Sequence, residues 1–383
     1  MKRVVLLGGG YVSLHAYGAM VRRLRGELRR GEVEIVVISA DTAHSFHGFT
    51  GEVVAGLLPV GLTRSPLAEV MPRARVIHAR VTRVSLDDRH VIYGDGSVLT
   101  YDALVVGTGG SEPVDGLEGA ATLRHPGGLT ELLERAGDGP VVVIGGGLAG
   151  VELAAAFVRR GGPVTVVHSG DRVVPALRAE QPRLANRCER ELDRLGVVVR
   201  TGVRAVAVCE DDVLLSDGTR LDARVVVATT GQRAIPLPGL DDLPRDVAGR
   251  LVTTPELLVA PDVWSGGDAA RVLHPRSGEP VTANALWAIK AGDQIGRNVA
   301  HTLRGRPGRP FRYLGLGQAA SFGVGHAVAD LYGLPITGWP AWLLRVGFFM
   351  RFMPSRSRAL RVPGALRSSS RSGVREVSAT VPG

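Results

Sequence analysis

The chain of 383 residues is long enough for two or three domains with substantial cores. Its 51 glycines and 45% hydrophobic residues are typical of an α/β protein with many tight turns between strands and helices. The formal net charge of +9 does not indicate a nucleic-acid-binding protein, because the arginines are spread through nearly every segment. The two cysteines, Cys188 and Cys209, form no CxxC motif, which excludes a local redox dithiol and a cysteine-rich metal site.

The N-terminus and the hydropathy of the chain bear on its location. Met1–Gly10 reads as a strand followed by a glycine turn rather than as a secretory signal peptide. No uninterrupted apolar run reaches about 18 residues, so we expect no membrane-spanning helix. These features predict a cytoplasmic protein.

The chain begins with the pattern of a βαβ unit and a hairpin meander. The predicted elements of this part are, in order, a strand at Val4–Leu7, the turn Gly8-Gly9-Gly10, a helix to about Arg30, a strand at Val33–Ile38, an alternating region at Val76–Leu99 with a turn at Gly94-Asp95-Gly96, and a buried strand running into glycine within Tyr101–Gly110. The same order returns further along: a strand from Val141 into a glycine turn, a strand at Val164–Val167, a meander at Val197–Leu221, and a strand within Ala223–Gly231. This internal repeat predicts two dinucleotide-binding units, at about residues 1–115 and 138–235.

The two glycine turns match the fingerprint GxGxxG. The first has Gly8 and Gly10 but Ser13 at the third position, whereas the second has all three glycines: Gly145, Gly147 and Gly150. Such turns bring bare backbone and a helix N-terminus close to a pyrophosphate. We therefore predict that both turns bind dinucleotides.

Neither second strand ends on the carboxylate that usually binds the adenosine ribose. The first strand ends at Ser39, with Asp41 two residues later, and Asp41 could reach a ribose hydroxyl. The second strand ends at His168, with Arg172 downstream, and these two side chains could meet a 2′-phosphate instead. They could equally be ordinary loop residues, so the sequence leaves the choice between NADH and NADPH open.

The last third of the chain contains a further glycine turn and two helices. Val263–Ser265 reads as a strand that leads into Gly266-Gly267-Asp268, and Ala283–Leu303 reads as a helix. From Trp339 to Met353 an aromatic and aliphatic helix is interrupted by Arg345 and Arg351, which is typical of an interfacial helix whose arginines reach lipid phosphates. The alternative for this helix is a homodimer interface.

In this order the motifs resemble those of the two-dinucleotide-binding-domain flavoproteins of the glutathione-reductase fold, and among them the type II NADH:quinone dehydrogenases. The motifs are GGGYVS (Gly8–Ser13), HSFHGFTGEVVAG (His44–Gly56), LTYDALVVGTGG (Leu99–Gly110), GGGLAGVELA (Gly145–Ala154), VVVATTG (Val225–Gly231), SGGDAA (Ser265–Ala270) and ANALWAIKAGDQIGRNVA (Ala283–Ala300). The resemblance implies FAD over the first turn and NADH or NADPH over the second. It also implies cofactor contacts from Thr108, Gly109, Gly231, Gly267, Asp268 and Ala285. His44 and His47 then belong to loop packing near the flavin, and no metal site is expected.

The resemblance singles out two side chains for catalysis. Glu152 stands near the nicotinamide–flavin contact in the family and would help proton transfer to the acceptor, although a carboxylate in the first turns also suits a helix N-terminus. Lys290 replaces a glutamine of the family's quinone pocket, as Leu286 and Ala291 replace two others. An ammonium group there would stabilise reduced flavin or bind the acceptor, and the alternative is a solvated helix-face lysine.

These observations predict an α/β fold of two Rossmann-like domains with a C-terminal helical region. The predicted ranges are 1–118 and 258–330 for FAD, 119–257 for NAD(P)H, 331–362 for a membrane-associating or dimerising region, and 363–383 for a disordered tail. The expected activity is electron transfer from NAD(P)H through FAD to a membrane quinone, by a protein peripheral on the inner face of the cell membrane. The alternatives are a different acceptor, such as a redox protein or a metabolite, and a flavin-binding redox sensor with little turnover.

Overall fold

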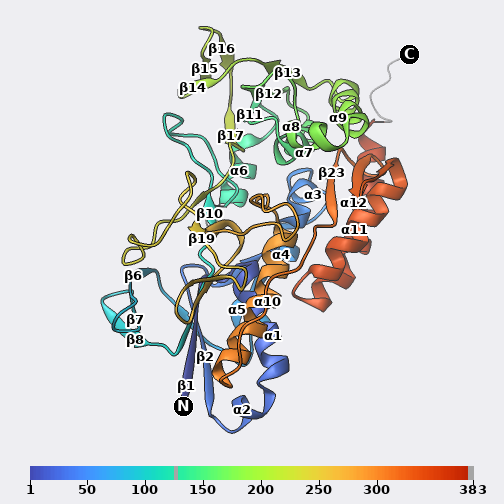
Figure 1. The fold of residues 1–383 in the computed structure, drawn as a ribbon. Helices are drawn as coiled ribbons and strands as arrows, with labels where there is room; N and C mark the ends of the chain where they lie inside the picture. The colour runs from blue at the N-terminus through green and yellow to red at the C-terminus, as the bar shows by residue number, and fades with distance from the viewer. Residues whose placement is uncertain (125–127, 378–383) are drawn as a thin grey trace, which may run out of the picture. The chain divides into compact units, whose positions relative to one another are not determined.

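The computed structural model describes residues 1–124 and 128–377, which group into two compact units (Figure 1). Unit 1 comprises Met1–Ser45, Arg64–Ser111 and Gln232–Gly315, and unit 2 comprises Phe46–Thr63, Glu112–Gly231 and the residues from Leu316 onward. The units divide the chain differently from the predicted ranges: residues 46–63, 112–118 and 316–330 group with unit 2, and residues 232–257 group with unit 1. Which range binds which cofactor stays a prediction.

Unit 1 is built on a six-stranded sheet in the order β20-β21-β9-β1-β2-β5, in which only the pairing of β20 with β21 is antiparallel. Its strands are β1 (Lys2–Leu7), β2 (Val33–Ser39), β5 (Arg75–His78), β9 (Ala103–Val106), β20 (Leu258–Ala260) and β21 (Val263–Ser265). The central strands are continuously apolar because both faces of the sheet are covered. Val4 and Leu6 face one core cluster, and Val5 and Leu7 face another.

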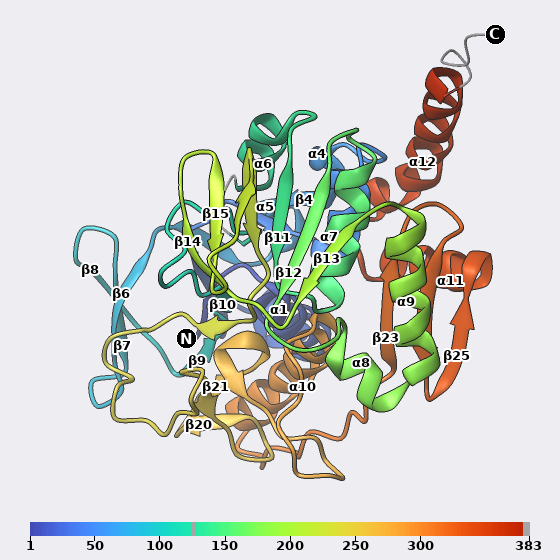
Figure 2. The ribbon, with the colours of Figure 1, turned by 90° about the horizontal axis from the view of Figure 1, so that it is seen from above.

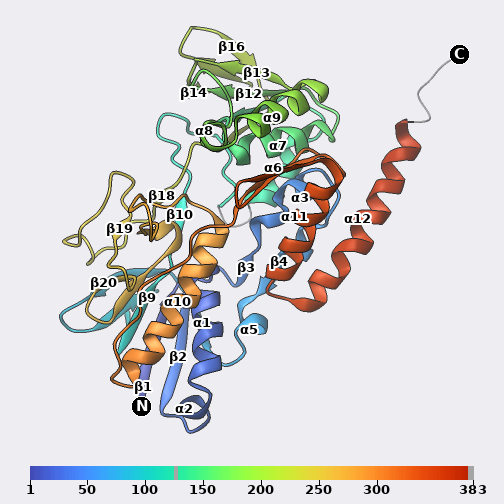
Figure 3. The same cartoon turned by 45° about the vertical axis from the view of Figure 1, so that its right-hand side comes forward.

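Helices α1 (Tyr11–Arg23) and α10 (Ala285–Leu303) lie side by side on the first of these faces (Figure 3). Their close approach depends on glycine, since a Cβ on Gly296 would lie 2.3 Å from the carbonyl oxygen of Ala16. On the opposite face packs the antiparallel meander β6 (Val81–Ser85), β7 (His90–Tyr93) and β8 (Ser97–Thr100). The meander therefore begins later than the predicted Val76, because residues 76–78 pair in parallel with β2 as part of β5.

Unit 2 repeats this plan around a parallel sheet in the order β13-β12-β11-β17 (Figure 2). Its strands are β11 (Val141–Ile144), β12 (Val164–His168), β13 (Val198–Thr201) and β17 (Val225–Ala228). One face is covered by α7 (Leu148–Val158) and α9 (Pro182–Arg194), and the other by the meander β14 (Ala205–Val208), β15 (Asp212–Leu215) and β16 (Arg220–Asp222). The predicted repeat of two dinucleotide-binding folds is confirmed.

The C-terminal part of unit 2 adds a three-stranded antiparallel sheet and two helices. These elements are β23 (Gly317–Ser321), β24 (Ala327–Leu331), β25 (Leu334–Thr337), α11 (Gly338–Phe352) and α12 (Arg356–Val377). Residues 363–377 are thus helical where the sequence predicts a disordered tail, and Val362 and Leu366 are buried on the helix. The rest of that predicted tail, residues 378–383, lies outside the described residues. No helix in the described part of the chain is long and apolar enough to cross a membrane.

The remaining elements are short. They are α2 (Arg25–Arg29), β3 (Ala43–Ser45), η1 (His47–Phe49), α3 (Thr50–Val54), α4 (Val60–Thr63), β4 (Arg64–Pro66), α5 (Leu67–Val70), β10 (Gly110–Ser111), α6 (Gly128–Ala136), α8 (Pro175–Glu180), β18 (Arg233–Ala234), β19 (Leu251–Val252), η2 (Gly267–Ala269) and β22 (Ala270–Arg271).

Candidate functional site

The first glycine turn joins β1 to α1 in unit 1. Gly8 has a φ of +91°, and a Cβ there would lie 2.6 Å from the carbonyl oxygen of Gly107. Gly10 is the N-cap of α1 and offers no side chain, so the first N–H groups of the helix have no side-chain cap. Ser13, at the third position of the motif, is fully buried. The turn is therefore a bare backbone cradle at a helix N-terminus, as a pyrophosphate requires.

Ser39 and Asp41 follow β2 as the sequence predicts. Ser39 is buried, and its hydroxyl accepts a hydrogen bond from the backbone N–H of Asp41 at 3.2 Å. This bond holds the loop that carries the Asp41 carboxylate, which is partly exposed. The two residues thus act as one local turn at the carboxyl end of β2.

Near the first glycine turn, Nε2 of His44 and Oγ1 of Thr108 are buried polar atoms of unit 1 without a hydrogen-bond partner among the described residues. Nδ1 of His44 lies 2.9 Å from the carbonyl oxygen of Gly9, and burial lowers the pKa of His44 to about 4. The imidazole is therefore neutral, with Nδ1–H donating to Gly9 and Nε2 left as an acceptor. Gly109 follows Thr108 with a φ of +74°. A buried polar atom without a partner indicates a site that a polar ligand completes.

Asp268 lies in η2 at the carboxyl end of β21, after Gly267, whose φ is +62°. The side chain of Asp268 stands close to β10, because a Cβ on Gly110 would lie 3.2 Å from its Cβ. Ala285 is the first residue of α10, and Asn284 caps that helix by accepting a hydrogen bond from the N–H of Leu286 at 2.7 Å. Asp268 and Asn284 line the same small pocket.

Lys290 lies one turn further along α10. Its Nζ is 5.8 Å from the ring centroid of Tyr313, within the range of a cation–π interaction. Leu286 and Ala291, the other two substituted positions of this helix, are buried. The structure thus gives the ammonium group an aromatic neighbour and does not test its predicted role.

The second glycine turn joins β11 to α7 in unit 2 and is the tighter of the two. Gly145 has a φ of +112°, and a Cβ on Gly150 would lie only 1.9 Å from the carbonyl oxygen of Gly145. Gly147 caps α7, and a Cβ there would meet nothing within 4 Å, so the space before the helix is open. Gly231, after β17, is equally open and has a φ of +100°. Glycine is needed here for both conformation and close approach.

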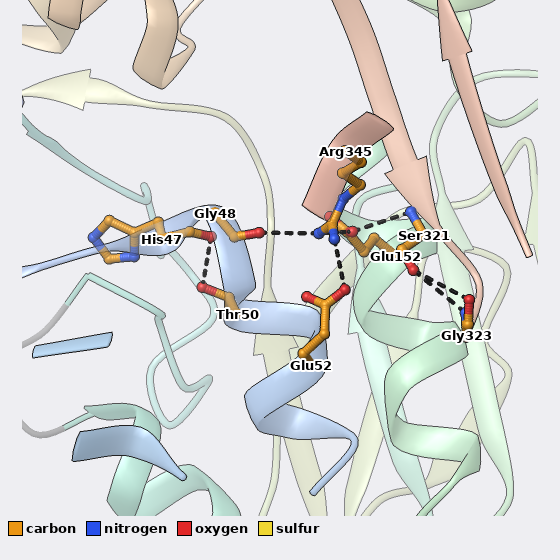
Figure 4. A network of polar contacts seen from close by, with 8 residues as sticks. All are labelled: His47, Gly48, Thr50, Glu52, Glu152, Ser321, Gly323 and Arg345. Atoms are coloured by element: carbon orange, nitrogen blue, oxygen red, sulfur yellow. Dashed lines mark hydrogen bonds and ion pairs between the residues drawn. The ribbon is translucent and has the colours of Figure 1, made fainter. Parts of the chain in front are cut away.

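Unit 2 also contains a buried ion cluster, which we call the glutamate–arginine triad: Glu52, Glu152 and Arg345 (Figure 4). The guanidinium of Arg345 on α11 donates to Oε1 of Glu52 on α3 and to Oε1 of Glu152 on α7, each at 2.5 Å. It also donates to the carbonyl oxygen of Gly48 at 3.0 Å. The backbone N–H of Ser321 donates to Glu152 at 3.1 Å. Three segments far apart in the sequence thus meet at one guanidinium.

The triad carries two carboxylates for one cation. The side chains of Arg345 and Glu52 are 1% and 3% exposed, whereas Glu152 keeps 20% of its side chain exposed. Burial raises the pKa of Glu152 to about 7; Arg345 opposes the shift and the Glu52 carboxylate adds to it. Glu152 therefore gains or loses a proton near neutral pH, and part of its side chain is in contact with solvent.

A family model described as pyridine nucleotide-disulphide oxidoreductase matches residues 2–292. The chain belongs to this family. It is 26% identical to a demethylphylloquinone reductase of Synechocystis over 94% of either chain. It is 27% identical to a type II NADH:quinone oxidoreductase of Mycobacterium tuberculosis over 89% of this chain and 81% of that one.

A structure of NDH2 from Plasmodium falciparum in complex with NADH superposes with a TM-score of 0.82, at 12% identity, over 97% of this chain and 99% of that one. The low identity limits this likeness to the fold. Together with the family match, these relatives confirm the resemblance given by the motifs. The chain is an NAD(P)H-dependent oxidoreductase of the type II NADH dehydrogenase kind, with FAD as its flavin.

The residues of unit 1 fit the flavin cofactor of this family. The Gly8–Gly10 cradle leaves no room for a side chain beside Gly107, and the unpartnered atoms of His44 and Thr108 lie in the segments next to that cradle. A bound dinucleotide would place its pyrophosphate at the cradle and would offer hydrogen-bond partners to these two atoms.

The lipid-facing position predicted for Arg345 is wrong. The pattern of α11 predicts an arginine that reaches lipid phosphate, but its guanidinium lies inside unit 2 between two glutamates. The partners explain this outcome, because a buried charge needs an opposite charge and hydrogen bonds. The sequence predicts no separate role for Glu52, which lies within the HSFHGFTGEVVAG motif. No local sequence signal indicates this pairing, because Glu52, Glu152 and Arg345 lie in three separate segments of the chain.

Proposed function

We propose that this oxidoreductase reduces a quinone and that Glu152 supplies a proton to that reaction. Conversion of a quinone to a quinol takes two electrons and two protons, of which NAD(P)H provides two electrons and one proton. The second proton has to come from solvent through the protein. The observation that carries the proposal is the buried position of Glu152 with a pKa raised to about 7, where a general acid works best.

In this proposal each glycine turn holds one dinucleotide. The backbone at Gly8–Gly10 binds the pyrophosphate of FAD, with Ser13, Ser39, Asp41, Thr108, Gly109, Gly267, Asp268 and Ala285 around the rest of the cofactor. The backbone at Gly145, Gly147 and Gly150 binds that of NAD(P)H, together with His168 and Gly231. When bound, FAD accepts two electrons from the nicotinamide and passes them to the acceptor. The residues of the chain orient these groups and exclude water.

Glu152 exchanges its proton within the triad. Arg345 and the N–H of Ser321 hold the carboxyl group of Glu152 in place. The side chain of Glu152 is 20% exposed, which gives the carboxyl group access to solvent. Glu52 keeps the cluster one negative charge in excess when both carboxylates are ionised, which favours uptake of a proton. A relay through cysteines is not required, since Cys188 is buried with its pKa raised to about 12 and Cys209 is exposed.

The membrane as the source of the quinone is supported by the outer face of α11 and α12. Trp339, Leu343 and Leu344 are 57%, 58% and 40% exposed on α11, and Leu360 is 78% exposed on α12. Exposed arginines, Arg351, Arg356 and Arg361, follow along the same two helices. Apolar side chains flanked by cations match an anionic lipid surface. A homodimer formed through this face is the competing arrangement.

A different acceptor is favoured by one observation, the replacement of the family's glutamines by Leu286, Lys290 and Ala291 on α10. One experiment distinguishes a quinone from another acceptor. The purified flavoprotein is reduced anaerobically by NAD(P)H and then mixed with a water-soluble quinone analogue. Rapid reoxidation by the quinone supports the proposal. Slow reoxidation by the quinone with rapid reoxidation by ferricyanide would assign the electrons to another acceptor, and failure of the flavin to bleach would indicate a sensor.

A further inference from the structure

The end of β12 carries His168 at the position where a ribose-binding carboxylate excludes NADPH from many NADH-binding units. His168 follows the Gly145–Gly147 turn by about 20 residues, and β11 and β12 are parallel neighbours, so their carboxyl ends meet at one edge of the sheet. A carboxylate there would repel the 2′-phosphate of NADPH. An imidazole would not.

The orientation of the His168 ring is fixed by the glycine turn. The backbone N–H of Gly146 donates to Nδ1 of His168 at 3.3 Å, and a Cβ on Gly146 would lie 2.8 Å from Cγ of that ring. Because Nδ1 accepts this bond, the ring hydrogen is on Nε2, which is therefore a donor. Gly170 leaves space beside Nε2, since a Cβ there would lie 3.0 Å from it. His168 thus offers an N–H at the strand end.

Arg172, the other side chain that the sequence indicates for a 2′-phosphate, is held elsewhere. Its Nε and Nη2 both donate to the carboxylate of Glu189, and Nη2 also donates to Asn186. Arg178 donates to the same two residues, at 2.7 Å to Glu189 and 2.8 Å to Asn186. One carboxylate therefore holds two guanidinium groups, and this cluster keeps a net positive charge.

We propose that His168 sets the coenzyme choice and makes NADPH a substrate of this chain alongside NADH. The 2′-phosphate accepts a hydrogen bond from Nε2–H and lies near the net positive cluster of Arg172, Arg178 and Glu189. Arg172 is a positioning residue of this cluster rather than the main phosphate ligand, because Glu189 occupies two of its three nitrogens. The proposal rests on nucleotide binding at the Gly145–Gly150 turn and does not depend on the electron acceptor.

Two variants that differ only in charge test the proposal. His168→Glu places a carboxylate at the strand end, and His168→Gln places a neutral amide of the same size there. The measured quantity is kcat/KM for NADPH divided by kcat/KM for NADH. We expect this ratio to fall at least about tenfold in His168→Glu relative to His168→Gln, because a carboxylate next to a phosphate is a like-charge contact. Equal ratios in the two variants would overturn the proposal.

A binding measurement on the unmodified protein needs no turnover and no variant. Calorimetry compares adenosine 2′,5′-bisphosphate with adenosine 5′-monophosphate, which differ only in the 2′-phosphate. We expect the bisphosphate to bind at least as tightly as the monophosphate. A bisphosphate affinity about tenfold weaker or worse refutes the role of His168 even if the enzyme reduces a quinone, whereas loss of quinone reduction alone leaves the role of His168 standing.

Discussion

Arg345 donates a hydrogen bond to Glu152 at 2.5 Å, although 193 residues separate them in the chain. The same arginine holds Glu52, so the C-terminal helix α11 is joined to α3 and α7 by a buried ion cluster. On helix α11 the Arg345 side chain therefore points inward, whereas Leu343 and Leu344 point outward. This arrangement connects the surface proposed to meet lipid with the carboxyl group proposed to deliver a proton.

Glu152→Gln should slow acceptor reduction by about 100-fold or more and leave flavin reduction by NAD(P)H much less affected. The donor is the protonated carboxyl group, so wild-type acceptor reduction should fall as pH rises through about 7, the raised pKa of Glu152. Stopped-flow measurement of both half-reactions from pH 5.5 to 8.5 checks this.

Glu52→Gln is the matched variant for that experiment. It removes the neighbouring carboxylate that helps to raise the pKa of Glu152, so the pH profile should move to lower pH rather than disappear. An unchanged profile in both glutamine variants would show that Glu152 is only a structural partner of Arg345.

Arg345→Met should destabilise the protein by about 3 kcal/mol, because it leaves two buried carboxyl groups without a cation. The loss should be smaller at pH 5 than at pH 8, because Glu152, whose pKa is raised to about 7, is neutral at the lower pH and then needs no cation. Urea unfolding at both pH values measures the effect. Arg351→Met, on the exposed side of the same helix, is the control and should change the free energy of unfolding by less than about 0.5 kcal/mol. Similar losses in both variants would contradict the importance of the triad.

Lys290→Met should slow reoxidation of the flavin by about tenfold and flavin reduction by NAD(P)H by less, if the ammonium group stabilises developing negative charge. Lys290→Arg preserves the charge and the aromatic contact with Tyr313 and should retain most of the rate. Rapid mixing of each variant with NAD(P)H and then with a quinone analogue gives both rates. If Lys290→Met leaves both rates unimpaired, the lysine is a solvated surface residue.

Leu343→Glu should reduce binding to anionic vesicles by at least about tenfold, since burial of a leucine side chain in the interface contributes roughly 1.5–3 kcal/mol. Co-sedimentation with vesicles of phosphatidylcholine and phosphatidylglycerol measures the bound fraction. Val98→Glu on β8 is the matched control, because Val98 and Leu343 are 59% and 58% exposed. A dimer by light scattering that Leu343→Glu dissociates, without vesicle binding, would instead assign the face to a second copy of the chain.

The fold was largely accessible from the sequence because its signals are local. Apolar runs such as Val141–Ile144, each followed by glycine and a helix, predict buried parallel strands, and the repeat of the pattern predicts two such units. The predicted elements are wrong where tertiary packing outweighs the local sequence pattern. Residues 76–78 belong to the predicted alternating region but complete the parallel sheet, and residues 363–377 extend α12.

The candidate site likewise combines features that the sequence predicts with features that arise only from packing. The glycine turns are predictable from the sequence, because the positive φ at Gly8 and Gly145 and the lack of space at Gly150 are requirements of neighbouring residues. The partners of Glu152 and the inward position of Arg345 follow only from packing between distant segments. A pairing between residues 52, 152 and 345 leaves no trace in any short window of sequence. The raised pKa of Glu152 likewise comes from burial, which exists only once the three segments pack together.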